Sequence, residues 1–152
     1  LLAWQKGFKG ILSDKLLNNL DKNDFLLSWQ QIIKNKERIN YALLTKQEKA
    51  IGFVSFGPYD KEKDSEFAEI YGIYINPSFW RQGHAKSLME KAVSELKNSQ
   101  KYSAIYLWTM VQNVRAKRFY ENFGFILDGK TRNSKRNGEL FEECRYVYDL
   151  HS

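Results

Sequence analysis

Two stretches of the sequence carry residue types and spacings that suit chemistry on an anionic ligand. In the first, residues 68–75 have the composition of a strand that closes before Pro77, and apolar residues recur at helical spacing from Ala85 onward. The first N–H groups of a helix lack intrahelical partners and attract anions, and Gly83 would let a phosphate approach the backbone. An ordinary strand-to-helix turn fits the same pattern.

The second stretch is a helix predicted between Asn113, which suits an N-cap, and Gly124, which suits a C-terminal stop. By spacing alone, Tyr120 is a core aromatic residue of its apolar face. Glu69 lies in the otherwise apolar strand of the first stretch. Burial there would raise the pKa of its carboxyl group and suit it to act as a base, although a carboxylate facing solvent or a cation fits equally well.

The other reactive residues indicate no further chemistry. Cys144, the single cysteine, excludes an internal disulfide and a cysteine-based zinc cluster, and its strand context favours a buried small residue. His84 suits a backbone role in its loop, and His151 lies in the tail. No set of residues suggests a metal site.

The elements that must position these residues follow from periodicity and turn signals. The N-terminal third is predicted helical, with helices over 4–12, after Ser13 and after Asn23. Strands are predicted over 39–44 and 51–56 as a hairpin, over 104–109, from Phe125, and over 140–150, with a polar loop over 133–138. This order predicts a single domain (1–152) of the mixed α/β, α+β-like class: a mostly antiparallel mixed sheet flanked by helices.

Composition narrows the class of protein. No apolar run is long enough to span a membrane, and the cysteine usage favours the cytoplasm. The net charge is +6, and residues 112–138 hold seven Lys or Arg against two acidic residues. That basic region could serve a phosphorylated cofactor or nucleic acid, but no nucleic-acid-binding signature accompanies it.

The two stretches together resemble the GNAT N-acetyltransferase superfamily. Its phosphate-loop signature, Q/R-x-x-G-x-G/A, is matched at Gly83 and Ala85, with Trp80 in place of the first Gln or Arg. Its second signature, N-x-x-A-x-x-x-Y-x-x-x-G-F, is matched at every specified position: Asn113, Ala116, Tyr120, Gly124 and Phe125. The segment W-x-x-x-F-x-G-I from Trp4 to Ile11 also resembles bacterial members. Family members have a first strand before these helices, and we expect it to be missing from this chain.

The resemblance implies acetyl-CoA as cosubstrate and direct transfer to an amine in a ternary complex. Tyr120 would protonate the departing thiolate, and Glu69 would act as base through water. The resemblance places the cofactor on the strand edge, the phosphate loop and the next helix: Ile73, Tyr74, Ile75, Arg81, Gln82, Gly83, His84, Ala85, Lys86, Asn113 and Tyr120.

The acceptor is left open as an amine of a small molecule or peptide. Five acidic residues against two lysines in 58–70 would favour a cationic acceptor if that loop borders the cleft. The alternative is a non-catalytic CoA-sensing or nucleic-acid-binding module on the same fold. Dimerisation is common in the family, so a homodimer is also a candidate state.

Overall fold

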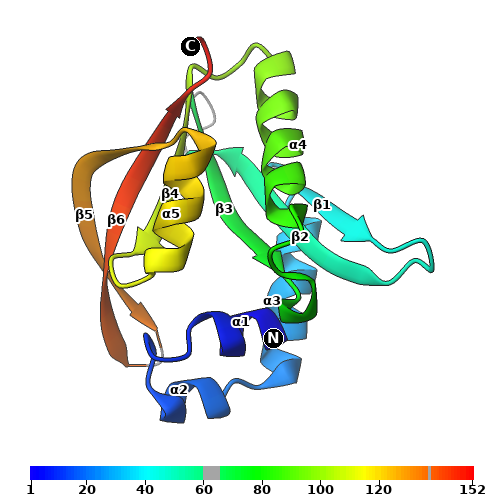
Figure 1. Cartoon of the computed structure of the whole chain (residues 1–152), viewed down its shortest axis with the longest axis vertical. Helices are drawn as coiled ribbons and strands as arrows, with labels where there is room; N and C mark the ends of the chain where they lie inside the picture. The colour runs from blue at the N-terminus through cyan, green and yellow to red at the C-terminus, as the bar shows by residue number, and fades with distance from the viewer. Residues whose placement is uncertain (60–65, 137) are drawn as a thin grey trace. The chain divides into compact units, whose positions relative to one another are not determined.

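The computed structural model describes residues 1–59, 66–136 and 138–152 (Figure 1). The chain divides into two compact units, residues 1–57 with 70–95 and residues 58–69 with 96–152. Six strands hydrogen-bond in the order β1-β2-β3-β4-β6-β5. β1 with β2, β4 with β6 and β5 with β6 pair antiparallel, whereas β3 and β4 pair parallel, so the predicted mixed, mostly antiparallel sheet with flanking helices is confirmed. The single-domain assignment of residues 1–152 stays a prediction.

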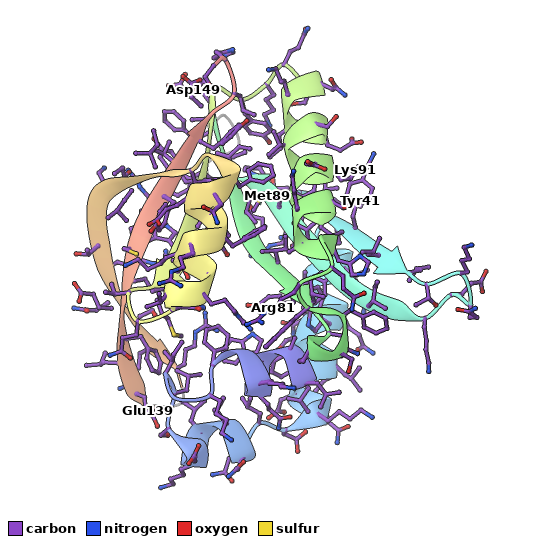
Figure 2. The ribbon with its side chains drawn as sticks, in the orientation of Figure 1. Tyr41, Arg81, Met89, Lys91, Glu139 and Asp149 are labelled. Carbon is purple, nitrogen blue, oxygen red and sulfur yellow. The ribbon has the colours of Figure 1, made fainter. Side chains whose placement is uncertain are left out.

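The first unit holds the N-terminal helices, a hairpin and the strand-to-helix turn. Its helices and strands are α1 (Leu2–Gly7), α2 (Asp14–Asn18), α3 (Lys22–Lys34), β1 (Ile39–Leu44) and β2 (Ala50–Pro58), followed by most of β3 (Phe67–Ile75) and α4 (His84–Asn98). Val54, Phe56, Met89 and Ala92 are fully buried here. Lys91 of α4 lies over the ring of Tyr41 in β1 at 4.9 Å (Figure 2). The helical spacing predicted from Ala85 therefore buries one face of α4.

The second unit is built on β4 (Ala104–Met110), α5 (Val114–Phe123), β5 (Ile126–Arg136) and β6 (Glu139–Asp149). β6 pairs with β4 on one side and with β5 on the other. Helix α5 lies against β6 (Figure 1), where Phe123 packs on Tyr148 and Tyr120 on Tyr146. The Asn113 side chain accepts the Ala116 N–H, and Gly124 has φ of +114°, so both predicted helix ends are confirmed.

Three predicted boundaries are wrong. The first helix ends at Gly7, and Gly10 with φ of +82° turns the chain before Leu12. Helix α3 is capped by Asp21, whose carboxylate accepts the N–H groups of Asn23 and Asp24. The loop predicted over 133–138 is strand as far as Arg136, because pairing with β6 supplies the backbone hydrogen bonds that its polar residues did not indicate.

Candidate functional site

The first half of the candidate site is the turn between β3 and α4, which we call the anion loop (residues 80–86). The first helical bond runs from the Ser87 N–H to the Gly83 carbonyl at 3.0 Å. The N–H groups of His84, Ala85 and Lys86 precede it and have no acceptor within the helix. Gly83 has φ of +81°, and a Cβ built there would meet nothing within 4 Å. An anion can therefore approach this backbone closely.

Arg81 gives the anion loop an unusual backbone. Its φ is +61°, a conformation that non-glycine residues rarely adopt. Its side chain is exposed at the N-terminal end of α4 (Figure 2). Such conformations persist when the surrounding structure holds them, and they concentrate at functional sites.

Trp80 anchors the loop to the strand that precedes it. Its indole Nε1–H donates to the carbonyl of Ile75 at 2.9 Å. On its other side, the Lys6 Nζ of α1 lies 5.9 Å from the centre of the ring. Trp80, which stands where the family signature has Gln or Arg, thus fixes the start of the loop to the end of β3. This hydrogen bond also uses the carbonyl of Ile75, one of the groups predicted to bind the cofactor arm.

β3 carries the other candidate residues of the first stretch. Its parallel register with β4 pairs Phe67 with Ala104 and Glu69 with Tyr106, and the strand continues for six residues beyond Glu69. Ile75 is buried, while Ile73 and Tyr74 are half-buried. Glu69 is half-buried between the fully buried Ala68 and the buried Ile70. Because successive side chains of a strand point to opposite faces, these two apolar neighbours do not surround the carboxyl group, and the base role of Glu69 stays a prediction.

Tyr120 lies in the second unit on the half-buried side of α5. Its ring packs against Phe119, Phe125 and Tyr146, with centroids 5.5 to 6.0 Å away. Burial lowers the pKa of the Arg115 side chain, and the nearby Tyr120 partly offsets this shift. Tyr120 thus packs in an aromatic cluster but is half-buried, not part of the buried core, and its acid role stays a prediction.

Two buried groups lie under α5. The Tyr146 hydroxyl donates to the Glu121 carboxylate at 2.6 Å, and burial together with this contact raises the pKa of Tyr146 well above its ordinary value. Burial also raises the pKa of Cys144, whose Sγ lies 3.6 Å from the Thr109 carbonyl oxygen. Cys144 is buried, as its strand context favoured, and a buried thiol with a raised pKa is a poor nucleophile.

The opposite side of the second unit carries a set of residues that sequence reasoning missed. Because paired strand residues share a face, Glu69 and Tyr106 face the same way, as do Trp108 with Arg145 and Arg132 with Glu143. We call this side the aromatic face: Tyr59, Phe67, Glu69, Tyr106, Trp108, Arg132, Glu143 and Arg145. In β6, Glu143 and Arg145 occupy alternate positions of a strand, which indicates that they share a face. The register that brings residues of the other strands to this face could not be predicted from the sequence.

Arg145 is the buried centre of the aromatic face. Its guanidinium lies 4.1 Å from the Tyr106 ring, donates from Nη1 to the Tyr59 hydroxyl at 3.0 Å, and forms an ion pair with Asp128 at 2.6 Å. Burial alone would raise the pKa of Asp128, but the hydrogen bonds from Arg145 and from the Lys130 N–H outweigh burial and hold that pKa below its ordinary value. A charge this buried requires such a partner.

Comparison with known proteins identifies the family. The family model described as Acetyltransferase (GNAT) matches residues 7–125, and the chain belongs to this family. It is 23% identical over 115 residues to the L-amino acid N-acetyltransferase AaaT of Escherichia coli (strain K12), covering 75% of this chain and 70% of that protein.

Two solved structures show the same fold. One is the paia N-acetyltransferase of Thermoplasma acidophilum in complex with coenzyme A, with a TM-score of 0.68 and 18% identity over 93% of this chain and 85% of that one. The other is a spermidine N-acetyltransferase SpeG chimera from Vibrio cholerae and hSSAT, with a TM-score of 0.67 and 21% identity over 85% of this chain and 75% of that one.

The described residues contain neither a cluster suited to a metal ion nor a helix suited to a membrane. Over 1–59, 66–136 and 138–152, no cluster of three His, Cys, Asp or Glu side chains suits a metal ion. In that same part of the chain, no helix combines the length and apolarity needed to cross a membrane. Of the five acidic residues behind the prediction of a cationic acceptor, Asp60, Glu62 and Asp64 lie outside the described residues.

Proposed function

We propose that this protein is an acetyl-CoA-dependent N-acetyltransferase that transfers the acetyl group directly to an amine of a small molecule or peptide. The observation that carries the proposal is the anion loop: three helix-start N–H groups beside a glycine of positive φ, where the family signature predicts a pyrophosphate site. The structure of the paia N-acetyltransferase with coenzyme A supports the choice of cosubstrate.

The residues of the anion loop would hold the cofactor by its phosphates. Backbone N–H groups from Arg81 to Lys86 would donate to the pyrophosphate, and the Arg81 side chain adds a positive charge. The backbone of Ile73 to Ile75 would pair with the amide-bearing pantetheine arm as a strand does. Because Trp80 already uses the Ile75 carbonyl, that pairing would rely on the other groups of Ile73 and Tyr74.

Two side chains would move the protons of the transfer. The acceptor nitrogen attacks the thioester carbonyl carbon, and the carbon–sulfur bond then breaks to release CoA. An alkylammonium has a pKa of about 10, so a base must first remove its proton. Glu69, acting through water, would accept that proton, and the Tyr120 hydroxyl would give one to the departing sulfur. Asn113 would support the cofactor through the helix end that it caps.

The finer statements about partners are also proposals. One similar protein is named for L-amino acids and another for spermidine. Both names indicate an amine acceptor, but they differ in the chemical class of the amine. We place the enzyme in the cytoplasm, which agrees with its single buried free cysteine. A homodimer is proposed by analogy with the family alone.

The test combines calorimetry with a panel of amines. Acetyl-CoA should bind, and free thiol should be released from it when amino acids, polyamines, aminoglycosides or peptides are added. Absence of acetyl-CoA and CoA binding would overturn the proposal. Binding of CoA with no turnover on any amine would favour a CoA-sensing module. RNA binding that weakens with rising salt would favour the nucleic-acid module instead.

A further inference from the structure

Tyr120 stands in the last turn of α5, where the backbone depends on contacts from outside the helix. Helix α5 ends at Phe123, and the Tyr120 carbonyl accepts from the N–H groups of Gly124 and Phe125 at 3.1 and 2.9 Å. The last turn of a helix tends to fray, because its carbonyl groups lack partners inside the helix. The position of the proposed acid is therefore set by the groups that hold this turn.

Ring contacts place Tyr120 in its cluster, but they are not directional. The ring centroids of Phe119, Phe125 and Tyr146 lie 5.5 to 6.0 Å from that of Tyr120. Apolar packing depends on the area that is buried and not on direction, so small rotations of the turn keep such contacts. A catalytic group must be held to within about 0.5 Å of its productive position, which requires a directional contact as well.

The directional contact is a hydrogen bond from β6. The Tyr146 hydroxyl donates at 2.6 Å to Oε1 of Glu121, the residue that follows Tyr120. Tyr146 is fully buried and belongs to a strand that pairs with β4 on one side and with β5 on the other, so its own position is fixed by the sheet. Burial and the contact with Glu121 raise the pKa of Tyr146, so the hydroxyl keeps its proton and remains a donor at neutral pH.

We infer that Tyr146 positions the phenol of Tyr120 through Glu121, and that acetyl transfer needs this hydrogen bond for its rate and not for binding of the cofactor. The inference rests on the proposed function, because it takes Tyr120 as the group that gives a proton to the departing sulfur. Tyr146 and Glu121 are positioning residues. Neither gives up or accepts a proton during the transfer.

Single variants test the positioning role. Tyr146→Phe removes the donor and keeps the ring, so it should lower kcat about tenfold and leave the KM for acetyl-CoA within about twofold, because a displaced acid costs rate and not ground-state binding. Glu121→Ala should have the same effect. Glu121→Gln keeps an oxygen that can accept the bond and should retain at least about a third of the wild-type kcat.

Tyr148→Phe is the matched control. It removes the hydroxyl of another β6 tyrosine, whose ring packs on Phe123 and Phe125 beside the same helix. Its kcat should match that of the wild type. A loss of kcat in Tyr148→Phe as large as that in Tyr146→Phe would overturn the inference, because removal of any hydroxyl under α5 would then have the same effect.

A double-mutant cycle distinguishes positioning from a general loss of structure. When Tyr146→Phe is added to Tyr120→Phe, kcat should fall by less than about twofold further, because the phenol that Tyr146 positions is no longer present. A loss of the same size in both backgrounds would overturn the inference, as would a higher KM with kcat unchanged. If Tyr146→Phe folds poorly in urea titrations, Glu121→Ala changes an exposed side chain and completes the same cycle.

The cycle also separates failure of this inference from failure of the proposed function. A large effect of Tyr120→Phe with none of Tyr146→Phe or Glu121→Ala would overturn the inference alone. Near-wild-type turnover of Tyr120→Phe would overturn the acid role and this inference together, while acetyl transfer stands. Absence of acetyl-CoA-dependent turnover in the wild type would overturn the proposed function and the inference with it.

Discussion

At the scale of single residues, Tyr120 illustrates how one position serves both packing and the proposed chemistry. Its ring belongs to an aromatic cluster with Phe119, Phe125 and Tyr146, which fixes its place on α5. Packing needs only the ring, whereas the proposed acid role needs the hydroxyl. The two roles can therefore be separated by removing one oxygen atom.

Tyr120→Phe should lower kcat by about 10²-fold or more while the KM for acetyl-CoA changes by less than about threefold, because a general acid acts mainly in the transition state. Steady-state kinetics with the best acceptor provides the measurement. Tyr148→Phe is the control, since its ring packs on Phe123 and Phe125 in the same cluster without a proposed role. Near-wild-type turnover of Tyr120→Phe would remove Tyr120 from the acid role.

At the scale of elements, the anion loop shows how a strand end and a helix start are locked together. Asn76 caps the 3₁₀ turn Pro77–Phe79, and its own N–H donates to the Ile51 carbonyl at 2.7 Å. Trp80 follows this turn directly, and its indole N–H donates to the carbonyl of Ile75. These bonds hold the chain as it enters the positive-φ residue Arg81.

Trp80→Phe should weaken CoA binding by roughly threefold to tenfold, because loss of a part-buried neutral hydrogen bond costs about 1 kcal/mol and loosens the loop. The affinity for CoA is measured by calorimetry, and kcat at saturating acetyl-CoA should change little. Trp29→Phe, whose ring packs on Phe53 of β2, should bind CoA as the wild type does. An unchanged affinity of Trp80→Phe would show that the loop keeps its shape without this bond.

At the scale of the whole molecule, periodicity and turn residues were enough to predict the order of elements. The helix signature from Asn113 to Phe125 and the strand-to-helix turn at Gly83 were predicted because each depends on local spacing. The aromatic face was not, because it requires the register of β4, β6 and β5 across an irregularity between Leu127 and Thr131. β5 itself was missed beyond Leu127 because its polar residues have weak strand propensity and depend on pairing with β6.

That irregularity gives the stability of the molecule a specific dependence on pH. Between Leu127 and Thr131 the chain bulges out of the β5–β6 ladder, and Asp128 holds the bulge by accepting from Arg145 and from the Lys130 N–H. The pKa of Asp128 is lowered in the folded state, so its stabilising contribution is present above the ordinary aspartate value of about 4 and is lost as the pH falls through the folded value.

Asp128→Asn should therefore lower the free energy of unfolding by about 2 kcal/mol near neutral pH, because Arg145 is left with a buried, uncompensated charge. The difference from wild type should shrink as the pH falls below about 4, where the unfolded carboxylate is protonated first and the folded carboxylate only at a lower pH. Urea unfolding across this range measures both curves. Glu142→Gln, an exposed carboxylate of β6, should follow the wild type throughout. A gap between Asp128→Asn and wild type that stays constant down to low pH would show that the shape of the bulge, and not the charge of Asp128, stabilises this part of the sheet.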